Sequence, residues 1–145
     1  MKELLLTSLF GLFLLLSADE NAVRTEEFPK EELQKQKNQI AAMVVKEISK
    51  TLPQKVDKYT TLVAIKNDGS TLVYTFEINS GVKSDEAIIK EDHSRMQRAV
   101  TQGVCQSSSK FLEAGINTRY IYRSAKSKKR LFVFDITQAQ CEKSR

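Results

Sequence analysis

Two cysteines, Cys105 and Cys141, place the strongest constraint on how this chain can fold. They lie downstream of a 13-residue apolar run, Leu4 to Leu16, which is typical of an export signal. Exported proteins fold under oxidising conditions, where two cysteines pair as a disulfide. We therefore predict a small domain with one intramolecular bond between Cys105 and Cys141. A redox-active pair is the alternative, but that role usually needs a Cys-x-x-Cys motif or a histidine partner, and neither arrangement is visible in the sequence.

The apolar run is too short for a membrane anchor, because about 20 helical residues are needed to cross a hydrocarbon core of about 30 Å. The tripeptide Leu16-Ser17-Ala18 places a small residue at a cleavage position, and no cysteine stands beside it that could carry a lipid. We expect residues 1–18 to be a signal peptide that is removed after Ala18. The mature protein is then expected to be soluble in the periplasm or outside the cell, without a stable membrane span.

The segment after the signal peptide is long enough for one domain with its own hydrophobic core. Residues 19–28 are polar and acidic and lack periodicity, which predicts a flexible leader. Residues 29–145 are predicted to form a single α+β domain. The net charge is +5, and both signs are mixed along the chain. This pattern favours a solvated surface and predicts no nucleic-acid partner.

The densest basic run is Lys126, Lys128, Lys129 and Arg130, which lies between two strand-like segments. One interpretation is a solubilising hairpin loop, and the other is an anion-binding site. Sites that recognise phosphate usually add aromatic or glycine-rich elements, and the run has none. The hairpin loop is therefore the preferred interpretation.

The spacing of apolar residues predicts three helices. Apolar side chains recur at threes, fours and sevens over residues 29–52, which predicts one amphipathic helix. Ser84 is followed by two acidic residues and would cap a second helix that runs to about Cys105. A short third helix over residues 108–114 is predicted to stop at Gly115, a residue suited to the left-handed C-terminal cap.

Alternating side chains predict four strands, at residues 60–66, 71–79, 116–123 and 130–138. The first two are joined by turn residues, Asn67 to Ser70, which predicts a hairpin. The order helix, strand, strand therefore occurs twice, with one extra short helix in the second unit. We predict an α+β fold in which two hairpins form a four-stranded, mainly antiparallel sheet with helices packed on one face.

No residue in the sequence is identified as catalytic or as a metal ligand, and no cofactor is expected. The single histidine, His93, lies at helical spacing from Ile89 and Met96, which favours a partly buried packing role. One histidine cannot build a multi-histidine zinc site. The sequence also lacks a phosphate-binding glycine loop and a Gly-x-Ser-x-Gly nucleophile turn.

Several segments carry a family resemblance that extends from about Leu52 to Cys141. They are Leu52-Pro53, Val56-Asp57, Tyr59 to Leu62, Leu72 to Phe76, Val104-Cys105, Phe111 to Ile116, Tyr120 to Tyr122 and Cys141. With them the chain resembles a widespread family of small exported bacterial domains that contain a disulfide. Its layout is also similar to that of the beta-class pilotins of type II secretion.

The family resemblance implies a compact α/β domain with one disulfide and no known catalysis. The pilotin likeness implies that a short helical segment of an outer-membrane secretin is bound, although this chain lacks the lipid-bearing cysteine of pilotins. We therefore expect an exported, non-enzymatic binding module for a protein partner, with a groove between helices and sheet. The alternative is a small secreted hydrolase or an inhibitor of one, which would require a deep polar pocket with perturbed carboxylates.

Overall fold

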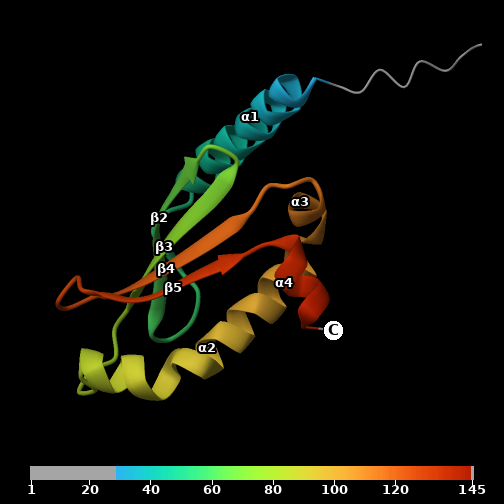
Figure 1. Ribbon diagram of the computed structural model, residues 1–145. Helices are drawn as coiled ribbons and strands as arrows, with labels where there is room; N and C mark the ends of the chain where they lie inside the picture. Colours follow the sequence, from blue (N-terminus) through green and yellow to red (C-terminus); the bar gives the residue numbers. More distant parts are fainter. Residues whose placement is uncertain (1–28, 145) are drawn as a thin grey trace, which may run out of the picture.

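In the computed structural model, residues 29–144 are described and form an α+β arrangement (Figure 1). The predicted signal peptide, 1–18, and leader, 19–28, lie outside the described residues. In chain order the elements are α1 (Lys30–Ser49), β1 (Gln54–Lys55), β2 (Thr60–Asp68), β3 (Thr71–Ile78), α2 (Asp85–Ser107), α3 (Ser109–Glu113), β4 (Thr118–Ser124), β5 (Arg130–Ile136) and α4 (Gln138–Lys143). None of the described helices is both long and apolar enough to cross a membrane.

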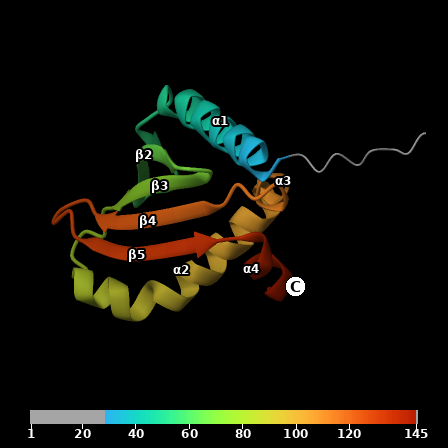
Figure 2. The ribbon, with the colours of Figure 1, turned by 45° about the horizontal axis from the view of Figure 1, so that its top comes forward.

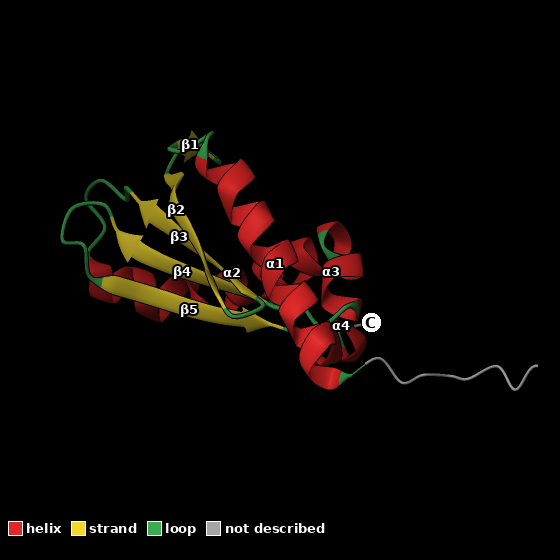
Figure 3. Cartoon of the chain, turned by 90° about the horizontal axis from the view of Figure 1, so that it is seen from above, coloured by secondary structure: helices red, strands yellow, loops and turns green. Residues whose placement is uncertain are grey.

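The sheet has five strands in the order β1-β2-β3-β4-β5, and it is mixed. Figure 2 shows β2 to β5 side by side in this order. Both predicted hairpins are present, because β2 pairs with β3 and β4 pairs with β5 in antiparallel fashion. The prediction of four mainly antiparallel strands is wrong in two respects. The central pair, β3 and β4, is parallel. The reason is that α2 and α3 return the chain to the end of the sheet where β3 begins, so β4 runs in the same direction as β3. A fifth strand, β1, pairs with β2 beside the end of α1 (Figure 3).

Both long helices cover the same face of the sheet. Along β3 the alternate residues Leu72, Tyr74, Phe76 and Ile78 point to this face. Tyr74 belongs to the apolar cluster under α1 and also to the larger cluster under α2. The helices therefore share one continuous core, with α1 against the β2–β3 half and α2 against the β4–β5 half (Figure 2).

The end of the chain differs from the prediction. The last strand stops at Ile136, and residues 138–143 form the short helix α4, which the sequence analysis did not predict. The backbone N–H of Thr137 donates to Oε1 of Gln140 at 2.9 Å. Threonine followed three residues later by glutamine is the signature of a capping box, so the missed helix had a local sequence signal.

A disulfide joins Cys105 in the last turns of α2 to Cys141 in α4, with 5.5 Å between the two Cα atoms. Cys141 is buried against the main core cluster, together with Val104 and Ile136. The bond therefore ties the C-terminal helix to the end of α2. Among residues 29–144 there is no free cysteine.

Ser84 caps α2 as predicted, because its hydroxyl accepts a hydrogen bond from the backbone N–H of Ala87 at 3.2 Å. We expect Ser84→Ala to lower the free energy of unfolding by about 1 kcal/mol, since one amide at the helix start loses its partner. Urea denaturation measures the change. Ser94→Ala, in the exposed middle of α2, is the matched control and should be neutral or slightly stabilising. Equal stability of wild type and Ser84→Ala would contradict the capping role.

Candidate binding groove

A groove of about 810 Å³ lies between α2 and the loop that joins β1 to β2. Its floor is the helix-covered face of the sheet, where Ile78, Tyr120 and Tyr122 are exposed to it. One wall is α2, with Met96, Ala99 and Gly103, and the other is loop 56–59. Sequence analysis expected a groove between helices and sheet, and this cavity has that position.

Tyr120 and Tyr122 on the floor of the groove belong to a layer of packed aromatic rings that also contains Tyr74 and Phe76. Tyr122 stacks on Phe76 with 4.8 Å between ring centroids, and Phe76 lies 4.9 Å from Tyr120. Tyr120 in turn meets Tyr74 edge to face at 5.1 Å. Sheet register causes this arrangement, because Tyr74 is opposite Tyr120 and Phe76 is opposite Tyr122 in the parallel β3–β4 pair. The floor is therefore a broad apolar surface whose shape is fixed by neighbouring strands.

The tyrosine hydroxyls remain neutral donors at any physiological pH. Burial raises the pKa of Tyr120 to about 12, and burial also raises the pKa of Tyr122 and Tyr74 above the ordinary value. Within residues 29–144 none of these three hydroxyls makes a hydrogen bond, and no buried side-chain nitrogen or oxygen there is sealed off without a partner. The three hydroxyls are therefore open to solvent rather than enclosed in the core, and those of Tyr120 and Tyr122, which line the groove, can reach an occupant.

Two large apolar side chains stand at the rim of the groove, on the β1–β2 loop. Val56 is 56% exposed and Tyr59 is 55% exposed. The loop is held in place, because Oδ1 of Asp57 accepts hydrogen bonds from the backbone N–H groups of Tyr59 at 2.8 Å and Thr60 at 2.9 Å. Exposed apolar groups on an ordered loop beside an apolar groove are typical of a protein docking surface.

Ion pairs at the first turns of α2 line part of the groove. Lys83 lies 2.9 Å from Asp92 and 2.8 Å from Glu91, and Arg95 lies 3.1 Å from Asp92. The hydrogen bond from Lys83 is the main reason that the pKa of Asp92 lies below its ordinary value. Asp92 is therefore an ionised structural partner rather than a proton donor.

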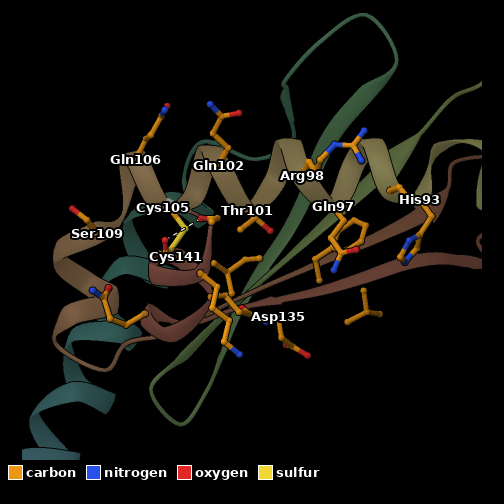
Figure 4. Close-up of a pocket in the computed structure, with 18 of the residues that line it drawn as sticks. His93, Gln97, Arg98, Thr101, Gln102, Cys105, Gln106, Ser109, Asp135 and Cys141 are labelled. Atoms are coloured by element: carbon orange, nitrogen blue, oxygen red, sulfur yellow. Dashed lines mark hydrogen bonds between the residues drawn. A yellow bond between two sulfur atoms is a disulfide. The ribbon is translucent and has the colours of Figure 1, made fainter.

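A second, more polar cavity of about 1240 Å³ runs along α2, β5 and α4, with His93 near one end, Ser109 near the other and the disulfide between them (Figure 4). His93 is exposed, which corrects the prediction of a partly buried side chain. Its ring still lies 5.7 Å from Phe132 and 5.5 Å from Phe134, because it sits on the flank of the stripe that packs on β5. Among residues 29–144, no three histidine, cysteine, aspartate or glutamate side chains are grouped to hold a metal ion.

The basic run lies in the β4–β5 hairpin loop, as the preferred interpretation expected, except that Arg130 is the first residue of β5. Lys128 lies 2.7 Å from Glu77, and Lys129 lies 3.1 Å from Glu86. Ser127 also donates to Asp85 at 2.6 Å. Two of the four cations are therefore paired with acids of this chain, which ties the loop to β3 and to the start of α2.

Three comparisons place the chain among known proteins. A family model described as a domain of unknown function (DUF8479) matches residues 32–132. Three solved structures have a similar fold. A Pseudomonas aeruginosa protein assigned to the secreted proteins is 14% identical with a TM-score of 0.66, and the match covers 75% of this chain and 96% of that one. The pilotin EpsS of the Vibrio vulnificus type 2 secretion system is 16% identical (TM-score 0.62, covering 77% of this chain and 96% of that one), and the Vibrio cholerae type II secretion pilotin AspS is 17% identical (TM-score 0.64, covering 77% of this chain and 98% of that one). A search of the curated proteins finds no match. At these identities the likeness establishes the fold alone.

Proposed function

The chain belongs to the family described as a domain of unknown function (DUF8479), and we propose that it works as an exported, non-enzymatic binding module of the pilotin type. In this proposal, residues 1–18 are removed as a signal peptide, and the protein acts in the periplasm or outside the cell. Its partner is a protein, and the groove beside α2 is the binding site.

The observation that carries the proposal is the aromatic floor of the groove together with Val56 and Tyr59 on its rim. The floor is the face of a sheet, whose backbone N–H and C=O groups are already paired between strands. An extended peptide laid on that face would find no backbone partners. A helix satisfies its own backbone, so an amphipathic helix is the form of peptide that suits this groove.

The fold likeness to two secretion pilotins supports the choice of partner. On this basis the helix is a short segment of an outer-membrane secretin, as the pilotin resemblance implies. The walls and floor of the groove are made by α2, the β1–β2 and β3–α2 loops and the sheet, so the described domain supplies the whole surface on which such a segment would bind.

The carboxylates with shifted pKa values do not favour a hydrolase. Hydrogen bonds from Lys128, Ser127 and Lys83 lower the pKa of Glu77, Asp85 and Asp92, respectively. A general acid at neutral pH needs a pKa that is raised instead. These carboxylates therefore serve as partners in ion pairs and hydrogen bonds, and binding without turnover is the better account of the molecule.

The test uses overlapping synthetic peptides that cover the secretin of the same bacterium, with binding measured by fluorescence anisotropy. We expect at least one helix-forming peptide to bind, and Val56→Asp to weaken its binding by about 10-fold or more, because a charge is placed on the apolar rim. Val82→Asp is the matched control, since Val82 is fully exposed in the β3–α2 loop and does not line the groove. Absence of binding by every peptide, or equal binding by Val56→Asp, would refute the proposal.

A further inference from the structure

Gly103 occupies an unusual position in the groove. It lies in the interior of α2, between Gln102 and Val104, and it lines the groove one turn beyond Ala99. Glycine is among the poorest helix formers, because its backbone loses the most freedom when the helix forms. A β-carbon added at Gly103 would meet no atom of this chain within 4 Å. Packing inside the molecule therefore gives no reason for glycine at this point.

The floor of the same groove carries a hydrogen-bond donor, the hydroxyl of Tyr122. Tyr122 is only 6% exposed, yet its hydroxyl makes no hydrogen bond within residues 29–144. The ring is fixed by stacking on Phe76 and by its place in β4, so the hydroxyl cannot turn far from the groove. The hydroxyl is open to the groove, where water can pair with it. An occupant that excludes this water must supply an acceptor in its place, because an unpaired buried donor costs free energy.

Both features have the same explanation if the groove is completed by another chain. We infer that the occupant is a helix that crosses α2 at Gly103, with a glycine, alanine or serine at the crossing, and that presents an oxygen acceptor to the hydroxyl of Tyr122. The missing β-carbon of Gly103 lets the two helix backbones approach closely. The Tyr122 hydroxyl then selects a helix that carries a polar oxygen within its otherwise apolar face.

This inference rests on the proposed function and adds a sequence requirement for the bound helix. A helix with large side chains along its whole apolar face would be excluded at Gly103. A helix without the oxygen acceptor would leave the Tyr122 donor unpaired in a dry site, which is a penalty against the wrong partner.

Three variants test the inference with the secretin peptide that binds the wild type. Gly103→Leu should weaken binding by about 30-fold or more, because the side chain fills the crossing point. Gly103→Ala should weaken binding less than Gly103→Leu does. The melting temperature of the Gly103→Ala protein should rise by about 2–5 °C, because alanine is a better helix former than glycine. Tyr122→Phe keeps the stacked ring and should lower affinity by about 5–10-fold. Gln102→Ala, on the neighbouring flank of α2 that faces the polar cavity, is the control and should bind as the wild type does.

The outcomes separate the inference from the proposed function. If the peptide binds and Val56→Asp weakens it, but the Gly103→Leu and Tyr122→Phe variants bind as the wild type does, the inference is wrong and the proposed function stands. If no secretin peptide binds, both are wrong. An alanine scan of the bound peptide adds a further check. Sensitive positions spaced by three and four support a helix, whereas strict alternation would indicate an extended strand and overturn the inference.

Discussion

Replacement of both Cys105 and Cys141 by serine is expected to lower the free energy of unfolding by about 3–4 kcal/mol, because the bond closes a long loop in the unfolded chain. The two cysteines are 36 residues apart in sequence and tie α4 to the end of α2. A domain is stabilised by only about 5–15 kcal/mol in total, so the loss is a large share. Urea denaturation followed by circular dichroism measures it.

Reduction of the wild-type protein supplies the control for this prediction. With an excess of reductant, the wild type should unfold at nearly the same urea concentration as the double serine variant, and without reductant it should be clearly more stable. Thiol labelling of the exported, denatured protein should find no free cysteine. Two reactive thiols, or equal stability of the oxidised wild type and the variant, would contradict a stabilising bridge.

Local signals in the sequence were sufficient for most of the helices and strands. The β2–β3 hairpin follows from alternating residues on each side of Gly69, whose φ of +56° is the conformation that the turn requires. Gly115, with φ of +80°, lies just after α3, as its suitability for a C-terminal cap predicts. Such features depend on a few neighbouring residues, so they can be read from the chain directly.

The joining of the two hairpins could not be predicted in the same way. Side-chain alternation is the same for parallel and antiparallel strands, so the sequences of β3 and β4 do not indicate whether the two strands run in the same or in opposite directions. The direction depends on where α2 and α3 deliver the chain, which is a property of the whole fold. The two-residue strand β1 is too short to show any alternation and was missed for that reason.

The candidate groove was predicted as a location but not as a set of residues. The sequence placed Tyr120 and Tyr122 on a strand, but it does not reveal that their rings form one layer with Phe76 from another strand. Val56 and Tyr59 lie between a helix and a strand, where exposure cannot be inferred from a pattern. Gly103 carried the one readable signal, since glycine inside a predicted helix calls for a reason.

Phe76→Ala is expected to lower the free energy of unfolding by about 3–5 kcal/mol, because it removes a buried ring and leaves a cavity. Phe76 is 5% exposed and contacts both Tyr120 and Tyr122 in the centre of the main core cluster. The variant also removes the support of Tyr122. We therefore expect groove binding to weaken by more than the loss of folded protein alone explains, when it is measured at a temperature where the variant is still folded.

Phe111→Ala is the matched control, because the same ring is deleted from a partly exposed position in α3. Its cost in stability should be less than half that of Phe76→Ala, since less apolar surface returns to water and no closed cavity forms. Its peptide binding should equal that of the wild type, because Phe111 does not line the groove. Equal losses of stability at the two positions would show that Phe76 does not hold the core together. Unchanged binding by folded Phe76→Ala would show that the stacked floor is not needed to position Tyr122.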